Sequence, residues 1–136
     1  MPIVKRVDHV AIAVEDIESA LTFWQDTLGL GRVRIQDVPG EEVRSALLPI
    51  GGSAIELVEP TTSGSGLARF LAKRGPGLHH VCLEVDDLAG WLALLKEKNV
   101  PLINETPVAG AGGRSYGFIH PKGANGILVE LYQLPE

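Results

Sequence analysis

The chain has 136 residues, 45% hydrophobic and 21% charged, which is the composition of a globular domain rather than a disordered chain. It lacks the ~18 consecutive apolar residues of a membrane span, and its N-terminus lacks the apolar segment of a signal peptide. The net charge of −5 and the 5% aromatic content argue against nucleic-acid and membrane partners. The one cysteine, Cys82, lies in an apolar run, so we expect a buried thiol and a cytoplasmic protein.

The first half of the chain predicts a strand, a helix and three further strands. A strand-like run begins at His9 and ends in acidic residues that can cap a helix. Apolar residues recur with helical spacing from Ile17 to Leu28, and Gly29 is expected to end that helix. Three strand-like runs follow, separated by glycine-containing turns: residues 32–38, 43–50 and 54–59.

The second half repeats this order at an offset of 71 residues. A strand-like run from His80 matches the run from His9, and a helical pattern starting at Leu88 follows it, with Asn99 and Pro101 as its expected end. Three strand-like runs come next: residues near 102–103, 115–119 and 127–132.

Each half therefore predicts a βαβββ module, and a module of roughly 65 residues would bury little surface alone. We expect one α+β domain over residues 1–136 in which the two tandem modules pack together, with the helices outside and a concave face inside. The modules cover about 5–60 and 77–134. Residues 61–76 form a turn-rich linker and a short helix from about Leu67 to Lys73.

The repeat also pairs two histidines with two glutamates. Glu56 and Glu130 interrupt the last apolar strand of each module, just as His9 and His80 open the first. A carboxylate in such a run is costly to bury unless it is paired or binds a metal. Two imidazoles and two carboxylates suit Zn²⁺, Co²⁺, Ni²⁺, Mn²⁺ or Fe²⁺ better than Ca²⁺. Four ligands fit either a closed tetrahedral site or an octahedral site with two open positions.

Several stretches resemble the vicinal oxygen chelate (VOC) superfamily, which includes glyoxalases, and within it the methylmalonyl-CoA epimerase family. These stretches are residues 55–60 (IELVEP), 77–80 (GLHH), 118–122 (FIHPK) and 126–131 (GILVEL). The resemblance extends from about Val7 to Gln133. It implies paired βαβββ modules with a metal site in the cup between them, and a homodimer.

The resemblance assigns His9, Glu56, His80 and Glu130 as ligands of a divalent ion. Co²⁺ is favoured, and Mn²⁺, Ni²⁺, Zn²⁺ and Mg²⁺ remain open. The implied reaction interconverts (2R)- and (2S)-methylmalonyl-CoA by removal and return of the C2 proton through a metal-stabilised enolate. Glu130 is then one catalytic base.

The resemblance does not assign the second base, because Ser45 stands where some epimerases of this family carry a glutamate. Serine is a poor base at neutral pH, so another group is needed on the second face of the substrate. Glu56, the symmetric carboxylate, is favoured for this role. Glu42 and a bound water are the alternatives.

The implied substrate is a small-molecule acyl-CoA, whose phosphates need basic or polar contacts. The candidate contacts are Lys122 and Ser115, with Arg114 beside them. Three further basic residues lie on the short helix after the linker: Arg69, Lys73 and Arg74.

Other functions also use this fold. A lactoylglutathione lyase of the glyoxalase I type carries a similar ligand set, but the sequence patterns at 55–60 and 120–122 favour the epimerase. A binding protein of the bleomycin-resistance type would generally lack the full set of four ligands. An extradiol dioxygenase would leave Glu56 surplus.

Overall fold

The computed structural model describes residues 2–135, with no side-chain description for Pro39 and Ala111. Contacts divide the chain into two units. His9–His79 forms what we call the first-module unit, and the described parts of Met1–Asp8 and His80–Glu136 form the second-module unit. Strands β1 (Val4–Ala13) and β5 (Gly77–Val85) each contribute residues to both units.

The first-module unit contains four neighbouring strands in the order β2-β3-β4-β1. The new strands are β2 (Arg34–Val38), β3 (Val43–Ile50) and β4 (Ser53–Pro60). Strand β3 pairs antiparallel with both β2 and β4, and β4 pairs parallel with β1. The three strand-like runs predicted after the first helix are therefore confirmed, within two residues at each end.

The helix predicted between residues 17 and 28 is confirmed, but it changes character along its length. It begins as the α-helix α1 (Ile17–Leu21) and continues as the π-helix η1 (Thr22–Thr27). Asp16 caps its start, because one carboxylate oxygen accepts hydrogen bonds from the Ser19 amide at 3.0 Å and the Ser19 hydroxyl at 2.6 Å. Its end is marked by Gly29, whose φ of +77° is readily adopted by glycine.

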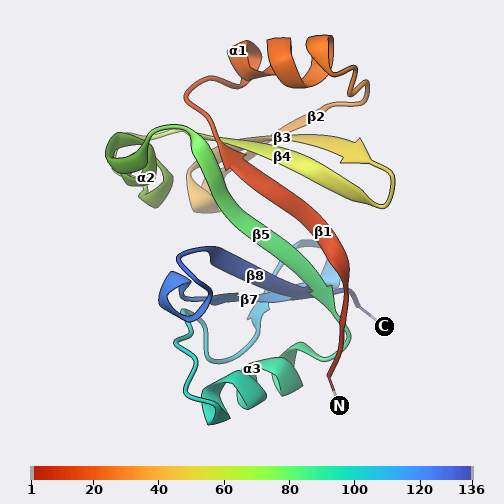
Figure 1. Cartoon of the computed structure of the whole chain (residues 1–136), viewed down its shortest axis with the longest axis vertical. Coiled ribbons are helices and arrows are strands. Elements are labelled where there is room, and N and C mark those ends of the chain that lie inside the picture. The colour runs from red at the N-terminus through yellow and green to blue at the C-terminus, as the bar shows by residue number, and fades with distance from the viewer. Residues whose placement is uncertain (1, 136) are drawn as a thin grey trace. The chain divides into compact units, whose positions relative to one another are not determined.

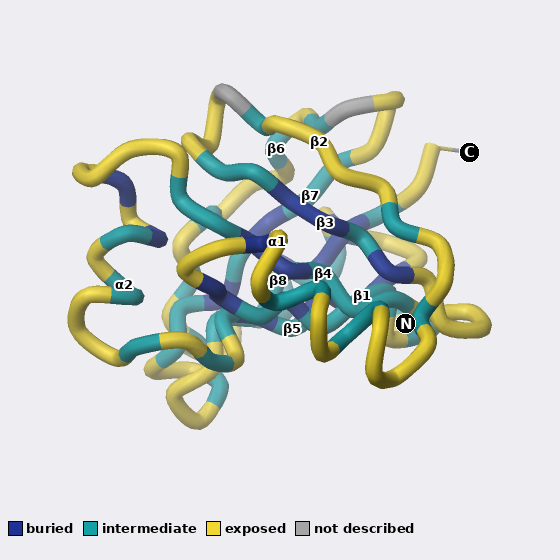
Figure 2. The backbone as a smooth tube through the Cα atoms, turned by 90° about the horizontal axis from the view of Figure 1, so that it is seen from above, coloured by how far each residue is buried: buried dark blue, intermediate teal, exposed yellow. Residues whose placement is uncertain are grey.

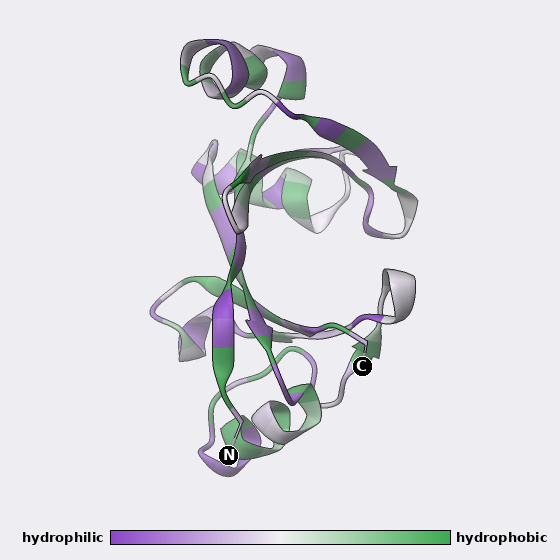
Figure 3. Ribbon diagram, turned by 90° about the vertical axis from the view of Figure 1, so that its right-hand side faces the viewer, coloured by the Kyte–Doolittle hydropathy of each residue, from purple (hydrophilic) through white to green (hydrophobic). Residues whose placement is uncertain are grey.

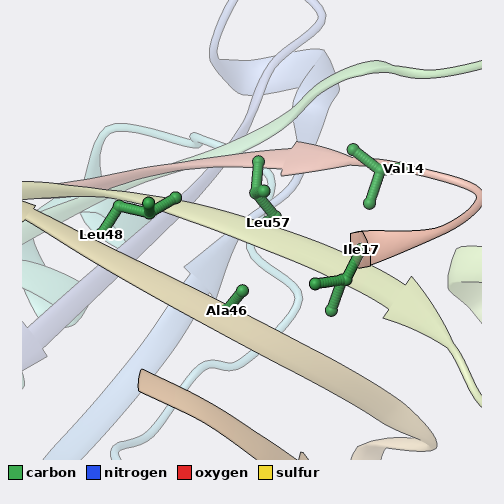
Figure 4. Close-up of a cluster of buried hydrophobic side chains, with 5 residues drawn as sticks. All are labelled: Val14, Ile17, Ala46, Leu48 and Leu57. Atoms are coloured by element: carbon green, nitrogen blue, oxygen red, sulfur yellow. The ribbon is translucent and has the colours of Figure 1, made fainter. Parts of the chain in front are cut away.

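A cluster of buried aliphatic side chains joins this helix to the sheet (Figure 4). Ile17, Leu48 and Leu57 are fully buried, and Ala46 and Val14 complete the cluster. The helix therefore covers one face of the first-module sheet, as Figure 1 also shows. Figure 2 shows that burial is concentrated in strands, while the outer turns of the helices are exposed.

The second-module unit repeats this arrangement with the strand order β5-β8-β7-β6. The new strands are β6 (Val108–Ala109), β7 (Ser115–Ile119) and β8 (Leu128–Gln133). Strand β8 pairs parallel with β5 and antiparallel with β7. Helix α3 (Leu88–Glu97) covers one face through Leu88 and Leu92, which pack with Ile119 and Leu131. As expected, this helix ends near Asn99, which has a φ of +61°.

The strand predicted near residues 102–103 is reduced to a single antiparallel bridge. Leu102 makes only an isolated bridge to Ile119, and the short strand β6 lies further along the chain. The amide of Phe118 on β7 donates to the side-chain oxygen of Asn104 at 2.8 Å instead of to a backbone carbonyl. Because a side chain occupies this ladder position, strand pairing does not continue there.

A short helix, α2 (Gly66–Arg74), follows the linker as predicted. Ser65 caps it by accepting a hydrogen bond from the Ala68 amide at 3.1 Å. Its Leu67 packs with Ala13 and Val58, on the face of the first-module sheet opposite α1. No helix in the described residues 2–135 is long and apolar enough to cross a membrane.

Substitution of Leu57 by alanine should lower the free energy of unfolding by about 2–5 kcal/mol, because it leaves a cavity in a well-packed core. Urea denaturation followed by circular dichroism measures this change. Leu28→Ala is the matched control, because the Leu28 side chain is exposed and its loss should cost less than about 0.5 kcal/mol. Equal losses in the two variants would contradict the assignment of the core.

Candidate metal centre and active site

The first-module unit brings His9 and Glu56 together. Strand β1 carries the histidine and the neighbouring strand β4 carries the glutamate, with Ala11 and Glu56 in register. His9 Nε2 lies 3.4 Å from Glu56 Oε1, and both side chains are mostly buried. The predicted pairing of one histidine with one glutamate is therefore present in this unit.

The second-module unit repeats this pair with His80 and Glu130. Cys82 on β5 is in register with Glu130 on β8, so the histidine again stands two residues before the register partner of the glutamate. His80 Nε2 lies 3.6 Å from Glu130 Oε1, and these side chains are also mostly buried. Cys82 is buried as predicted.

Both glutamates lie on the sheet face that the module's helix leaves uncovered. Three residues after Glu56, Glu59 accepts a hydrogen bond from the first amide of α1, that of Ile17, at 2.7 Å. Three residues after Glu130, Gln133 accepts from the first amide of α3, that of Leu88, at 2.8 Å. Because neighbouring strand residues alternate between faces, residues three apart point to opposite faces.

The geometry within each pair suits a shared divalent ion. Distances of 3.4 and 3.6 Å exceed the usual 2.9–3.0 Å of an N–H···O hydrogen bond. Two ligand atoms each about 2.1 Å from one ion stand roughly 3.0–3.4 Å apart, close to the separations found here. Imidazole nitrogen and carboxylate oxygen are also the donors that mid-series divalent metals accept.

The two glutamates have different surroundings. Ser45 on β3 donates from its hydroxyl to Glu56 Oε2 at 3.1 Å, and its residue is only 2% exposed. Phe118 on β7 is the cross-strand partner of Glu130 on β8. The Phe118 ring lies edge-to-face with the His80 ring, with the two centroids 6.1 Å apart. One carboxylate therefore accepts a hydrogen bond from a hydroxyl group, and the other has an aromatic residue as its cross-strand neighbour.

A charged network that sequence reasoning missed lies in the second-module unit. Arg6 donates to Asp8 and to Glu84, each at 2.9 Å, and the Tyr132 hydroxyl donates to Asp8 at 2.8 Å. Lys5 adds an ion pair with Glu84 at 3.3 Å. Hydrogen bonding from Arg6 lowers the pKa of Glu84, which is 5% exposed. The available signal was that Glu84 interrupts the apolar run of β5, just as Glu130 interrupts that of β8.

This network joins β1 to both strands that carry ligands in this unit. Asp8 directly precedes His9, Glu84 follows His80 by four residues, and Tyr132 follows Glu130 by two. Burial raises the pKa of Tyr132 to about 12, with the hydrogen bond to Asp8 as the next cause. The network therefore pins the start of β1 against β5 and β8.

The predicted substrate contacts lie at the two ends of β7. Lys122 is exposed in the turn η4 (Pro121–Gly123), and its amide donates to His120 Nδ1 at 3.0 Å. Arg114 is exposed and lies over the Tyr132 ring at 5.7 Å. Ser115 pairs with Gln133, which places it on the sheet face opposite Glu130.

Two of the three basic residues on α2 have structural contacts. Arg69 donates to the carbonyl of Gly64 at 2.7 Å, which ties the helix to its own linker. The Arg74 guanidinium lies 5.5 Å from the Phe70 ring centroid, within the range of a cation–π interaction. Lys73 is exposed near the end of the helix.

The family model described as the Glyoxalase/Bleomycin resistance protein/Dioxygenase superfamily matches residues 8–118 of the chain. This match covers well over half of the chain, and the paired βαβββ modules are those expected of the superfamily. The chain belongs to this superfamily. The resemblance inferred from the sequence stretches is therefore confirmed, together with the α+β fold class.

Three known proteins are closely similar to this chain over nearly its whole length. The ethylmalonyl-CoA/methylmalonyl-CoA epimerase of Cereibacter sphaeroides is 40% identical over 95% of this chain and 98% of its own. The mitochondrial methylmalonyl-CoA epimerase of Mus musculus is 37% identical over 94% of this chain and 72% of its own. A variant of the Streptomyces coelicolor methylmalonyl-CoA epimerase, solved with 2-nitronate-propionyl-CoA, superposes with a TM-score of 0.87. It is 32% identical and covers 97% of this chain and 96% of its own.

Tyr132→Phe should lower the free energy of unfolding of this superfamily member by about 1 kcal/mol at pH 7, because it removes the buried hydrogen bond to Asp8. The pKa of about 12 in the folded protein lies above the ordinary tyrosine pKa of 10.0, so this contribution to stability is complete below pH 10 and is lost as the pH rises toward 12. Urea denaturation of both proteins at pH 7 and over that range measures the difference. A constant difference up to pH 12 would contradict the raised pKa.

Proposed function

We propose that this chain is a metal-dependent epimerase that interconverts (2R)- and (2S)-methylmalonyl-CoA. The observation that carries the proposal is the repeated pair of one histidine and one glutamate on the sheet face opposite α1 in the first module and opposite α3 in the second. The similarity to epimerases at up to 40% identity over nearly the whole chain supports this choice of reaction within the superfamily.

We propose that His9, Glu56, His80 and Glu130 together hold one divalent ion. The donor set favours Co²⁺, with Mn²⁺, Ni²⁺, Zn²⁺ and Mg²⁺ as further candidates. When bound, the ion supplies Lewis-acid stabilisation for the negative charge that develops on the thioester oxygen. The homodimer implied by the family remains an expectation of this proposal.

Glu130 is proposed to accept the C2 proton of the substrate. The electron pair of the broken C–H bond moves into the C1–C2 bond of the thioester enolate, and the carboxylate becomes a carboxyl group. Glu56, assigned as the second acid–base residue, gives a proton to the opposite face of C2, where the electron pair re-forms the C–H bond. Glu130 then releases its proton to solvent and Glu56 takes one up, which restores the starting protonation states.

The coenzyme A portion needs partners away from the reacting carbon. Lys122 and Arg114 are the proposed charged contacts, because both are exposed cationic residues on the loops that flank β7. Ser115 is proposed only as a contact at the start of this strand, since its register turns it away from Glu130.

The protein in D₂O should exchange the C2 proton of methylmalonyl-CoA for deuterium, because the proposed carboxyl protons equilibrate with solvent. Proton NMR measures this exchange, and a chiral assay measures inversion at C2. Exchange should stop after treatment with a chelator and return with Co²⁺ or Mn²⁺. A protein that shows no exchange with any metal, but isomerises the adduct of methylglyoxal and glutathione, would instead be a lyase of the glyoxalase I type.

Glu130→Gln should reduce C2 exchange by at least about 100-fold, because an amide cannot accept the proton and general-base catalysis typically contributes 10²–10⁴-fold. The same NMR assay measures this loss, with circular dichroism confirming the fold. Glu97→Gln is the matched control, because Glu97 is exposed at the end of α3. Near-normal exchange in the Glu130 variant would refute its role as a base.

A further inference from the structure

Ser45 and Glu56 form a buried polar contact beside the first histidine. The Ser45 hydroxyl lies 3.1 Å from Glu56 Oε2, while the other oxygen, Oε1, lies 3.4 Å from His9 Nε2. Each oxygen of the Glu56 carboxylate therefore lies next to a different neighbour, one beside Ser45 and the other beside His9. This arrangement restricts rotation of the carboxylate about its terminal bond.

Burial explains why this hydrogen bond is a strong constraint. Ser45 is 2% exposed, and it is followed in β3 by the fully buried Ala46. A buried hydroxyl that loses its partner pays the cost of desolvation without compensation. A hydrogen bond to an ionised carboxylate is also stronger than one between neutral groups. Both effects favour the conformation in which Ser45 holds Glu56 Oε2.

In the second module, the position that corresponds to Ser45 is occupied by an aromatic residue. Leu47 stands opposite Glu56 in the β3–β4 register, as Phe118 stands opposite Glu130 in the β7–β8 register. Ser45 lies two residues before Leu47, and Tyr116 lies two residues before Phe118. The rings of Tyr116 and Phe118 pack edge-to-face, with their centroids 5.8 Å apart. The repeat therefore has a hydroxyl contact in one module where it has an aromatic pair in the other.

We infer that Ser45 is a positioning residue that holds Glu56 in its metal-binding conformation, with Oε1 directed toward the ion shared with His9. This inference rests on the proposed function and deepens it. It also gives a role to the serine at the position where the resemblance implies a glutamate in some epimerases. Serine here orients the neighbouring carboxylate and takes no part in proton transfer.

Ser45→Ala should weaken binding of Co²⁺ by about 10–100-fold, the usual effect of removing a hydrogen bond that orients a metal ligand. Isothermal titration calorimetry with Co²⁺, repeated with Mn²⁺, measures the affinity without any dependence on turnover. Ser45→Thr keeps the hydroxyl group, so its affinity should lie closer to the wild-type value than that of Ser45→Ala.

Ser65→Ala is the matched control. Ser65 is also buried, and its hydroxyl caps α2 rather than contacting a proposed ligand. This variant should show a lower melting temperature but bind Co²⁺ with wild-type affinity. The control therefore separates a general loss of stability from a specific loss of metal affinity.

Suppose that the wild-type protein binds Co²⁺ and exchanges the C2 proton. If Ser45→Ala then binds Co²⁺ with wild-type affinity, only the role of Ser45 is overturned and the proposed function stands. A wild-type protein that binds neither Co²⁺ nor Mn²⁺ would overturn both this inference and the proposed metal dependence. Equal weakening in Ser45→Ala and Ser65→Ala would also overturn the inference, because metal affinity would then follow stability.

Discussion

Each module depends on the hydrogen bond that joins its last strand to the first amide of its helix. Glu59 makes this bond to α1, and Gln133 makes it to α3. An unpaired amide at a helix start needs a partner, and here the partner comes from the strand that also carries the glutamate. The bond thereby turns one face of the sheet toward the helix and leaves the other face to the proposed ligands. Hydrophilic and hydrophobic residues accordingly mix along the strands (Figure 3).

The two half-sites are related by the repeat but are not equivalent. Ser45 binds the carboxylate of Glu56, whereas Phe118 stands opposite Glu130. Groups of one chemical type can take different roles when their environments differ, and an epimerase needs a proton donor on one face of its substrate and a proton acceptor on the other. The repeated module thus supplies matched ligands, and differences in the neighbouring strands give the two glutamates different surroundings.

The charged network around Arg6 shows how the N-terminal strand is tied into the second-module unit. Buried Glu84 is compensated by Arg6 and Lys5, and Asp8 receives the Tyr132 hydroxyl. A buried carboxylate without these partners would be strongly destabilising. Asp8 is followed directly by His9, so the network fixes the chain immediately before a proposed ligand.

The sequence alone determined the repeat, the order of its helices and strands, the four proposed ligands and, through family-specific stretches, the superfamily. These features depend on local periodicity and on residue types at matching offsets. Only the tertiary structure decided that Ser45 contacts Glu56, that Arg6 bridges Asp8 and Glu84, and that the Asn104 side chain accepts the hydrogen bond of the Phe118 amide. Such contacts depend on strand register and on which residues face each other across the sheet, and no single segment encodes either one.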